Sequence, residues 1–157
     1  MKLISHRGNL RGPNPIKENT KDYIEAAIHK GFDVEIDIRA ELTNSTDPTS
    51  YKYILGHDYS QEATPYQWLL QFKDKLWIHC KNLEALYAFR NTDFHYFWHQ
   101  EDDFTLTSQK IIWTYPLKRV TSNSVIVCWD ESSAIDYMNS NAMGICCDYV
   151  SNIMEIK

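Results

Sequence analysis

The chain has 157 residues, of which 43% are hydrophobic and 13% aromatic, and this composition excludes a disordered or low-complexity protein. A formal net charge of −5 at pH 7 argues against broad nucleic-acid binding, because nucleic-acid-binding proteins carry a basic footprint. The length fits a single domain over residues 1–157, without an internal repeat or an interdomain linker.

The N-terminal part predicts a strand, a loop and a helix in turn. Lys2–His6 is a short apolar run that ends in a tight turn at Arg7 and Gly8, and residues 9–17 are rich in Gly, Pro and Asn. Asn19 or Thr20 is a suitable cap for a helix that runs to about residue 30, where Gly31 stops it.

The next stretch, residues 31–39, alternates between two unlike faces with the period of a strand. An exposed edge strand with a solvated charged face is the simplest interpretation of such alternation. Because the following segments also read as strands, we expect the acidic face to line a shared interior instead. Glu35 and Asp37 then point into one space, where two carboxylates repel each other unless a cation or a proton lies between them.

The rest of the chain alternates strands with short helices. Residues 40–50 are polar and predict a loop. Further strands are expected at residues 51–58, 76–81, 94–100, 111–116, 124–129 and 144–148, and helices at 64–73, 83–90 and 132–139.

This order of about eight strands predicts a parallel sheet with right-handed crossovers and, most simply, a compact (β/α)₈ TIM-type barrel. Typical barrels need about 250 residues, so several outer helices must be missing or shortened, most plausibly after the second, fifth and sixth strands. An open doubly wound sheet is the alternative, which fits the length better and the strand count worse.

Polar residues gather where the expected strands end. In a barrel all of these ends face one mouth, which is where the chemistry of such folds is carried out. The residues in these positions are His6, Arg7, Glu35, Asp37, His57, Asp58, His79, Lys81, His99, Gln100 and Asp148.

The same residues form an ordered set that resembles the glycerophosphodiester phosphodiesterases. The matching pieces are His6-Arg7-Gly8, Glu18-Asn19-Thr20, Glu35-Ile36-Asp37, His57-Asp58, a strand ending in Lys81, and Asp148 after a final apolar strand. The resemblance spans nearly the whole chain and extends to the wider phospholipase-C-like phosphodiesterase superfamily. It implies a barrel in a minimal form that lacks the usual helical insertion.

The resemblance also implies roles for individual residues. His6 and His57 match the catalytic histidines that act as general acid and general base, a role for which imidazole is suited because its pKa lies near neutrality. Arg7 and Lys81 match cationic groups that stabilise charge in the transition state. Glu18 matches the acidic residue after the first loop, which is expected to contribute to substrate binding by tethering Arg7 or a metal-bound water.

The implied cofactor is a divalent cation, Mg²⁺ or Ca²⁺, with Glu35 and Asp37 as ligands. The chain departs from the family at His79, since the family usually has Glu-x-Lys where this strand reads His79-Cys80-Lys81. Imidazole is a poor ligand for Ca²⁺ and a better one for Mn²⁺ or Zn²⁺. Three alternatives follow: His79 ligates a different metal, the two carboxylates bind a metal weakly, or the metal is lost.

Three further residues are candidates for contacts with substrate. His99 lies near the expected mouth, and Trp113 and Trp129 are placed to form an aromatic wall for a glycerol, sugar or inositol group. Core packing is the alternative explanation for the tryptophans.

The sequence therefore predicts a metal-assisted phosphoric diester hydrolase that cleaves a small glycerol- or polyol-phosphodiester. The alternative is a catalytically altered or inactive member of the family that binds a phospho-ligand or a sugar phosphate. A third hypothesis is an assembly role, in which a homo-oligomer covers the surface that missing helices expose. With no apolar run long enough for a signal peptide or a membrane span, we expect a cytoplasmic protein whose four cysteines are reduced.

Overall fold

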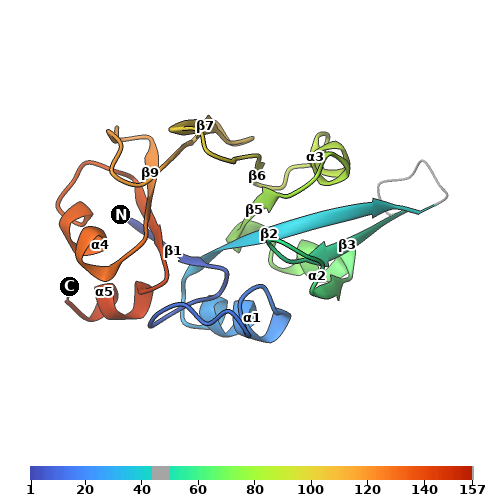
Figure 1. Ribbon diagram of the computed structural model, residues 1–157, viewed down its shortest axis with the longest axis horizontal. Coiled ribbons are helices and arrows are strands. Elements are labelled where there is room, and N and C mark those ends of the chain that lie inside the picture. The colour runs from blue at the N-terminus through green and yellow to red at the C-terminus, as the bar shows by residue number, and fades with distance from the viewer. Residues whose placement is uncertain (44–49, 157) are drawn as a thin grey trace.

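The computed structural model describes residues 1–43 and 50–156, which form one mixed ten-stranded sheet and five short α-helices (Figure 1). The strands are β1 (Lys2–His6), β2 (Asp33–Leu42), β3 (Tyr51–Leu55), β4 (Glu62–Thr64), β5 (Leu76–Cys80), β6 (Tyr96–Phe97), β7 (Phe104–Leu106), β8 (Ile112–Thr114), β9 (Ser124–Cys128) and β10 (Gly144–Cys147). The helices are α1 (Lys21–His29), α2 (Tyr66–Gln71), α3 (Leu83–Phe89), α4 (Glu131–Tyr137) and α5 (Val150–Ile156).

A parallel set of strands, in the order β6-β5-β2-β1-β10-β9-β8, forms the middle of the sheet. Three other strands are antiparallel to their neighbours: β3 pairs with β2, β4 with β3, and β7 with β8. The long strand β2 pairs with three strands, β1, β5 and β3, and is therefore central in the sheet.

The predicted (β/α)₈ barrel is wrong, because the sheet is mixed and does not close. The connection from β2 to β3 spans residues 43–50 and that from β7 to β8 spans residues 107–111, whereas a parallel crossover needs about a dozen residues or more. Both connections therefore return the chain antiparallel. Within residues 1–43 and 50–156, no strand ladder joins β6 to β7 or β8.

Other differences from the expected elements are local. The strand expected over residues 51–58 ends at Leu55, and the strand expected over 94–100 is reduced to the two residues of β6. The structure adds β4, β7 and α5, which the sequence pattern did not indicate. Of the loop expected over residues 40–50, the first part continues β2 to Leu42, and residues 44–49 lie outside the described part of the chain.

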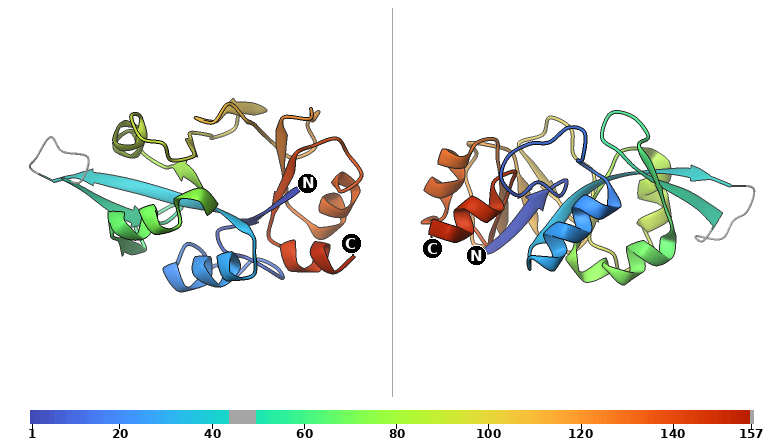
Figure 2. Two further views of the ribbon diagram at one scale, coloured as in Figure 1. Left: turned by 180° about the vertical axis from the view of Figure 1, so that it is seen from behind. Right: turned by 90° about the horizontal axis from the view of Figure 1, so that it is seen from below.

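The helices pack against one face of the sheet. Val34, Ile36 and Ile38 of β2 are fully buried there, in a cluster with side chains of α1, α2 and α3. A second cluster joins α4 and α5 to Ile126 of β9 and Ile145 of β10. Figure 2 shows α4 and α5 beside each other near the N-terminal strand in both views. An open doubly wound sheet, with helices on both faces, is therefore also not what the chain forms.

The opposite face of the sheet carries the acidic residues of β2. Asp33, Glu35 and Asp37 are only 4%, 2% and 0% exposed. A smaller apolar cluster on this face, which includes Trp77 and Trp113, lies beside them. The prediction that the acidic face of this strand lines an interior rather than facing water is confirmed.

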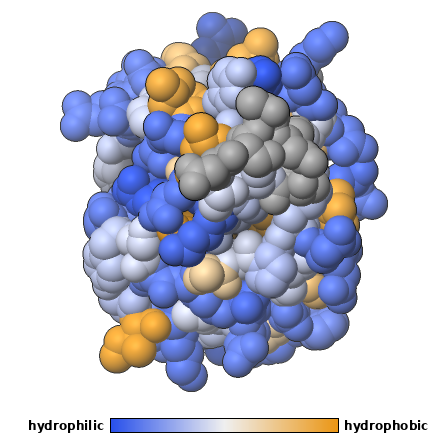
Figure 3. Space-filling model, turned by 90° about the vertical axis from the view of Figure 1, so that its right-hand side faces the viewer, coloured by the Kyte–Doolittle hydropathy of each residue, from blue (hydrophilic) through white to orange (hydrophobic). Residues whose placement is uncertain are grey.

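None of the helices among the described residues has the length and apolar character needed to cross a membrane. Figure 3 shows the face over the β2–β3 end of the molecule, where hydrophilic side chains dominate and apolar ones are scattered. The four cysteines all lie in the described part of the chain, where they are buried and form no disulfide.

Candidate active site

A cavity of about 740 Å³ lies where the carboxyl ends of the parallel strands meet. Eleven of the residues singled out from the sequence line it, although the barrel that was expected to gather them does not form. They are His6, Arg7, Glu35, His57, His79, Lys81, His99, Gln100, Trp113, Trp129 and Asp148. Parallel pairing of β1, β2 and β5 brings His6, Arg7, Glu35, His79 and Lys81 together, because parallel strands end at a common edge. His57 instead comes from the loop after the antiparallel strand β3.

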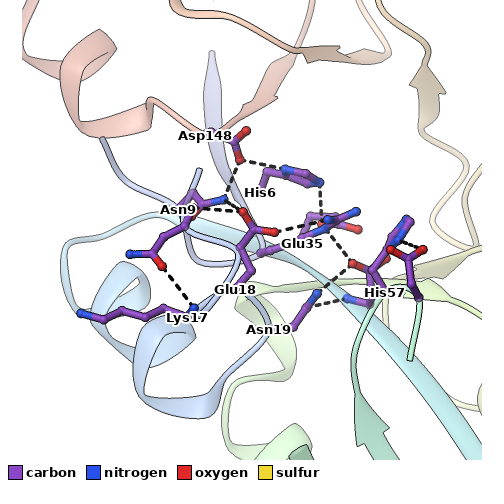
Figure 4. Close-up of polar contacts among 12 residues, drawn as sticks. His6, Asn9, Lys17, Glu18, Asn19, Glu35, His57 and Asp148 are labelled. Carbon is purple, nitrogen blue, oxygen red and sulfur yellow. Dashed lines mark hydrogen bonds and ion pairs between the residues drawn. The ribbon is translucent and has the colours of Figure 1, made fainter. Parts of the chain in front are cut away.

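His6, the last residue of β1, is held by a carboxylate from the other end of the chain. Its Nδ1 lies 2.8 Å from Oδ1 of Asp148, and its Nε2 lies 3.9 Å from Oε2 of Glu35 (Figure 4). The Asp148 contact leaves Nε2 on the cavity side. Burial alone would lower the pKa of His6, but the hydrogen bond that its Nδ1–H donates to Asp148 and the charge of Glu35 outweigh it, so that the pKa is raised.

Arg7 directs its guanidinium towards the buried acidic pair. Its Nε lies 2.8 Å from Oδ2 of Asp37, and its Nη1 donates to Oε2 of Glu18 at 3.3 Å. The backbone of Arg7 is left-handed, with φ of 54°, and Gly8 follows with φ of 89°. A Cβ on Gly8 would lie 2.9 Å from the ring of Tyr23, so the turn packs closely on α1.

Two asparagines complete this corner of the site; neither was predicted as a site residue, and Asn19 was expected only as a possible helix cap. Asn9 is fully buried and donates from Nδ2 to Glu18 at 2.9 Å and to Asp148 at 2.8 Å (Figure 4). Asn19 donates to Oδ2 of Asp37 at 2.9 Å and accepts from the backbone N–H of Asp37 at 2.9 Å. Asn9 directly follows the His6-Arg7-Gly8 motif and Asn19 lies within Glu18-Asn19-Thr20, and these positions could have identified both as site residues.

His57 lies in the loop that follows β3. Its Nδ1 lies 2.7 Å from Oδ1 of Asp58, and its carbonyl oxygen accepts a hydrogen bond from Arg39 at 2.7 Å. Gly56, with φ of 145°, makes the turn possible, because a Cβ there would lie only 2.0 Å from the carbonyl oxygen of Tyr59. His57 therefore resembles His6 in having one ring nitrogen engaged by a carboxylate.

His79 faces the acidic pair of β2 from the neighbouring strand β5. Its Nε2 lies 2.8 Å from the carbonyl oxygen of His99, which only accepts hydrogen bonds, so Nε2 carries a proton. Nδ1 then faces the carboxylates, 3.5 Å from Oε1 of Glu35 and 3.3 Å from Oδ1 of Asp37. The side chain that departs from the family pattern therefore points where a third metal ligand would point.

The charged groups of this cluster shift one another's pKa values. Burial would lower the pKa of His79, but the nearby carboxylates of Asp37 and Glu35 raise it to about 9. Burial would likewise raise the pKa of Asp37, but His79 and Arg7 lower it well below its usual range. Lys81 adds a further positive charge, with its Nζ 3.9 Å from Oδ1 of Asp37.

Glu35, Asp37 and His79 offer ligand atoms that all lie within 4.8 Å of one another. Two of the carboxylate oxygens, Oε2 of Glu35 and Oδ1 of Asp37, are buried and make no hydrogen bond within the described part of the chain. A cation would satisfy both oxygens, and so would a proton on His79 that Asp37 and Glu35 share. The donor set of two carboxylates and one imidazole suits Mn²⁺ or Zn²⁺ better than Ca²⁺.

The candidate substrate contacts occupy different positions. His99 stacks on Tyr115 with a ring-centroid distance of 5.7 Å, and its Nε2 lies 2.7 Å from the carbonyl oxygen of Asp102. Trp113 packs against Phe97 and is buried, whereas Trp129 is 60% exposed at the edge of the cavity. Glu18 does not line the cavity and lies behind Arg7, where the expected tether to Arg7 is present.

Comparisons with protein-family models, with curated proteins and with solved structures found no match to the chain. The assignment of a function therefore depends on the chemistry of the cavity itself. That cavity is lined by two histidines, each with Nδ1 beside a carboxylate, and by cationic side chains. Glu35 of the acidic pair also lines it, whereas its neighbour Asp37 is fully buried behind the lining, and each of the two has one unsatisfied oxygen.

Proposed function

We propose that the protein is a phosphodiester hydrolase that acts on a small glycerol- or polyol-phosphodiester. One observation carries the proposal: His6 and His57 line the same cavity, each with Nδ1 engaged by a carboxylate and Nε2 available to a ligand. A pair of imidazoles of this kind can remove a proton from an attacking oxygen and donate one to the leaving oxygen.

The cationic side chains support the same assignment. Arg7 and Lys81 line the cavity and supply the positive charge that a phosphodiester requires in a protein of net negative charge. The pairing of Arg7 with Asp37 and Glu18 fixes the guanidinium, so that its charge is oriented before the substrate binds. In the reaction proposed here, these two side chains hold the phosphate between the histidines and stabilise the charge that develops on its oxygens.

Glu35, Asp37 and His79 are the residues that would hold a divalent cation, and their unsatisfied buried oxygens support this part of the proposal. A cation bound there would neutralise a non-bridging phosphate oxygen and lower the pKa of the attacking hydroxyl. The Nε2–H of His79, held by the His99 carbonyl, keeps Nδ1 directed at the site.

A phospho-ligand binding module is the second candidate. The observation that favours it is the compensation already present around Asp37, whose carboxylate is contacted by Arg7, His79 and Lys81. A site whose charges are balanced in this way can bind an anion without the metal that hydrolysis in the resembled family requires.

The experiment that separates these candidates is hydrolysis of bis(p-nitrophenyl) phosphate and glycerophosphocholine across Mg²⁺, Ca²⁺, Mn²⁺ and Zn²⁺, with a chelator as control. We expect metal-dependent turnover that falls at least about 100-fold in His6→Ala and His57→Ala. His29→Ala, at the exposed end of α1, is the matched control and should retain full activity. Equal activity in all three variants would refute the assignment, and no turnover with any ion from the folded protein would favour the binding module.

A further inference from the structure

The cavity has two chemically different walls. The histidines, Arg7 and Lys81 form a charged wall, whereas the wall built by β8, β9 and the segments that follow them is largely apolar and aromatic. The residues of this second wall are Trp113, Tyr115, Pro116, Val127 and Trp129. Glycerol phosphates are polar throughout, so the proposed small polyol substrate does not account for an apolar wall of this extent.

The turn at the end of the apolar wall carries an exposed leucine in a strained conformation. The N–H of Lys118 donates to the carbonyl oxygen of Tyr115 at 3.2 Å, which closes a four-residue turn with Pro116 in its second position. Leu117 in the third position has φ of 66°, the pattern of a type II turn, in which glycine or asparagine is favoured. Leu117 is nevertheless 76% exposed, so neither the backbone nor the packing of the free protein explains a leucine there.

A tryptophan at the same edge shows a similar mismatch. Trp129 follows directly after β9 and is 60% exposed, although it lines the cavity. Its ring contacts that of Tyr115 edge to face, with centroids 5.5 Å apart, and this contact joins it to the turn that carries Leu117. The apolar wall therefore continues from buried Trp113 out to exposed Trp129. Leu117 does not itself line the cavity, but it directly follows Pro116, which does.

We propose that the substrate is an amphiphilic phosphodiester, with its phosphate against Arg7 and Lys81 and a single alkyl or acyl arm along the apolar wall to Trp129 and Leu117. The inference rests on the proposed function, since the charged wall must hold the phosphate. The complementarity is between one cavity with a charged wall and an apolar wall and one ligand with a charged centre and an apolar arm. In the proposed complex the apolar arm covers the exposed side chain of Leu117, and this contact would account for a leucine at the strained position.

The test measures binding separately from catalysis. The probes are n-butyl and n-octyl phosphate, used below micelle-forming concentrations in isothermal titration calorimetry; as monoesters they are not substrates of a diester hydrolase. A fully buried methylene increases affinity about fourfold. For an arm that is partly buried we expect octyl phosphate to bind at least about tenfold more tightly than butyl phosphate.

Variants then locate the arm. Leu117→Asn keeps a side chain of similar size and suits the positive φ. In this variant and, separately, in Trp129→Ala, octyl phosphate should bind less than about threefold more tightly than butyl phosphate. Leu83→Asn is the matched control, because Leu83 is 72% exposed at the start of α3 and does not line the cavity. This control should keep the ratio of the unmodified protein.

The outcomes separate this inference from the proposed function. Equal affinities for the two probes, or a ratio that Leu117→Asn and Trp129→Ala leave unchanged, would overturn the apolar-arm inference even if glycerophosphocholine is hydrolysed. If octyl phosphate binds more tightly than butyl phosphate and Leu117→Asn removes the difference, but the protein hydrolyses no diester, the subsite for the apolar arm would be supported and the hydrolase assignment overturned.

Discussion

Replacement of Asn19 by alanine tests how the acidic pair of the cavity is held in place. Asn19 is 1% exposed and makes two hydrogen bonds to Asp37, one to Oδ2 and one from the backbone N–H. A hydrogen bond to a charged group contributes about 1.5–3 kcal/mol and a neutral one about 0.5–1.5 kcal/mol. Asn19 also has φ of 55°, where alanine costs about 1–2 kcal/mol.

The sum predicts that Asn19→Ala lowers the free energy of unfolding by about 3–6.5 kcal/mol, measured by urea denaturation at pH 7. Asn19→Gly removes the same two hydrogen bonds but tolerates the left-handed backbone, so it should be about 1 kcal/mol less destabilised than the alanine variant. A loss below about 1 kcal/mol in Asn19→Ala would refute the reasoning. It would mean that Oδ2 and the backbone N–H of Asp37 do not depend on Asn19 for their hydrogen bonds.

Three further predictions concern other parts of the site and the fold. Burial, together with the charge of Lys2, lowers the pKa of His95 to about 4. The unfolded chain therefore binds a proton between about pH 6.5 and 4 that the folded chain does not. As the pH is lowered through that range, the free energy of unfolding should fall by about 1–2 kcal/mol, allowing for partial exposure of His95. Urea denaturation at pH 7 and 4.5 should show this loss, and His95→Gln should reduce it; an unchanged pH dependence in the variant would contradict the assignment. Asp148→Asn should lower turnover about 10²–10⁴-fold and lower the pKa of His6, as measured by NMR titration, because the carboxylate that orients and charges the ring is lost; an unchanged His6 pKa would count against it. Gly56→Ala should reduce turnover more than about tenfold, because the new Cβ forces the His57 turn to move, whereas Gly31→Ala, with no atom within 4 Å of its Cβ, should lose only about 1 kcal/mol of stability and no activity.

The composition of the site was largely predictable because it depends on strand ends rather than on the closure of the sheet. The alternation along residues 33–38 indicated that Glu35 and Asp37 share a face, and the structure places them on one buried face. His79 and Lys81 are two residues apart at the end of an expected strand, a spacing that puts both on one face, and both line the cavity. Parallel pairing of β2 with β5 brings His79 opposite Asp37 in register.

The topology was not predicted, because strand counting ignored the length of the connections. Residues 43–50 are too few for a crossover, so β3 had to return as a hairpin strand rather than continue a parallel barrel. The contacts of Asn9 and Asn19 were also missed, since a hydrogen bond between a loop and a distant strand leaves no periodic pattern in the sequence. The strain at Leu117 is a property of backbone geometry that the residue type does not indicate.

The pairing of β1 with β10 has a consequence for how the candidate site is assembled during synthesis. Asp148, whose carboxylate contacts His6, lies 142 positions further along the chain, and β10 provides the ladder that holds β1 on that side. While β10 is still inside the ribosome, His6 has already been synthesised but has no carboxylate partner. Contacts of such long range slow the search for the native state. A partly synthesised or C-terminally cleaved chain without β10 and Asp148 therefore cannot assemble this side of the cavity.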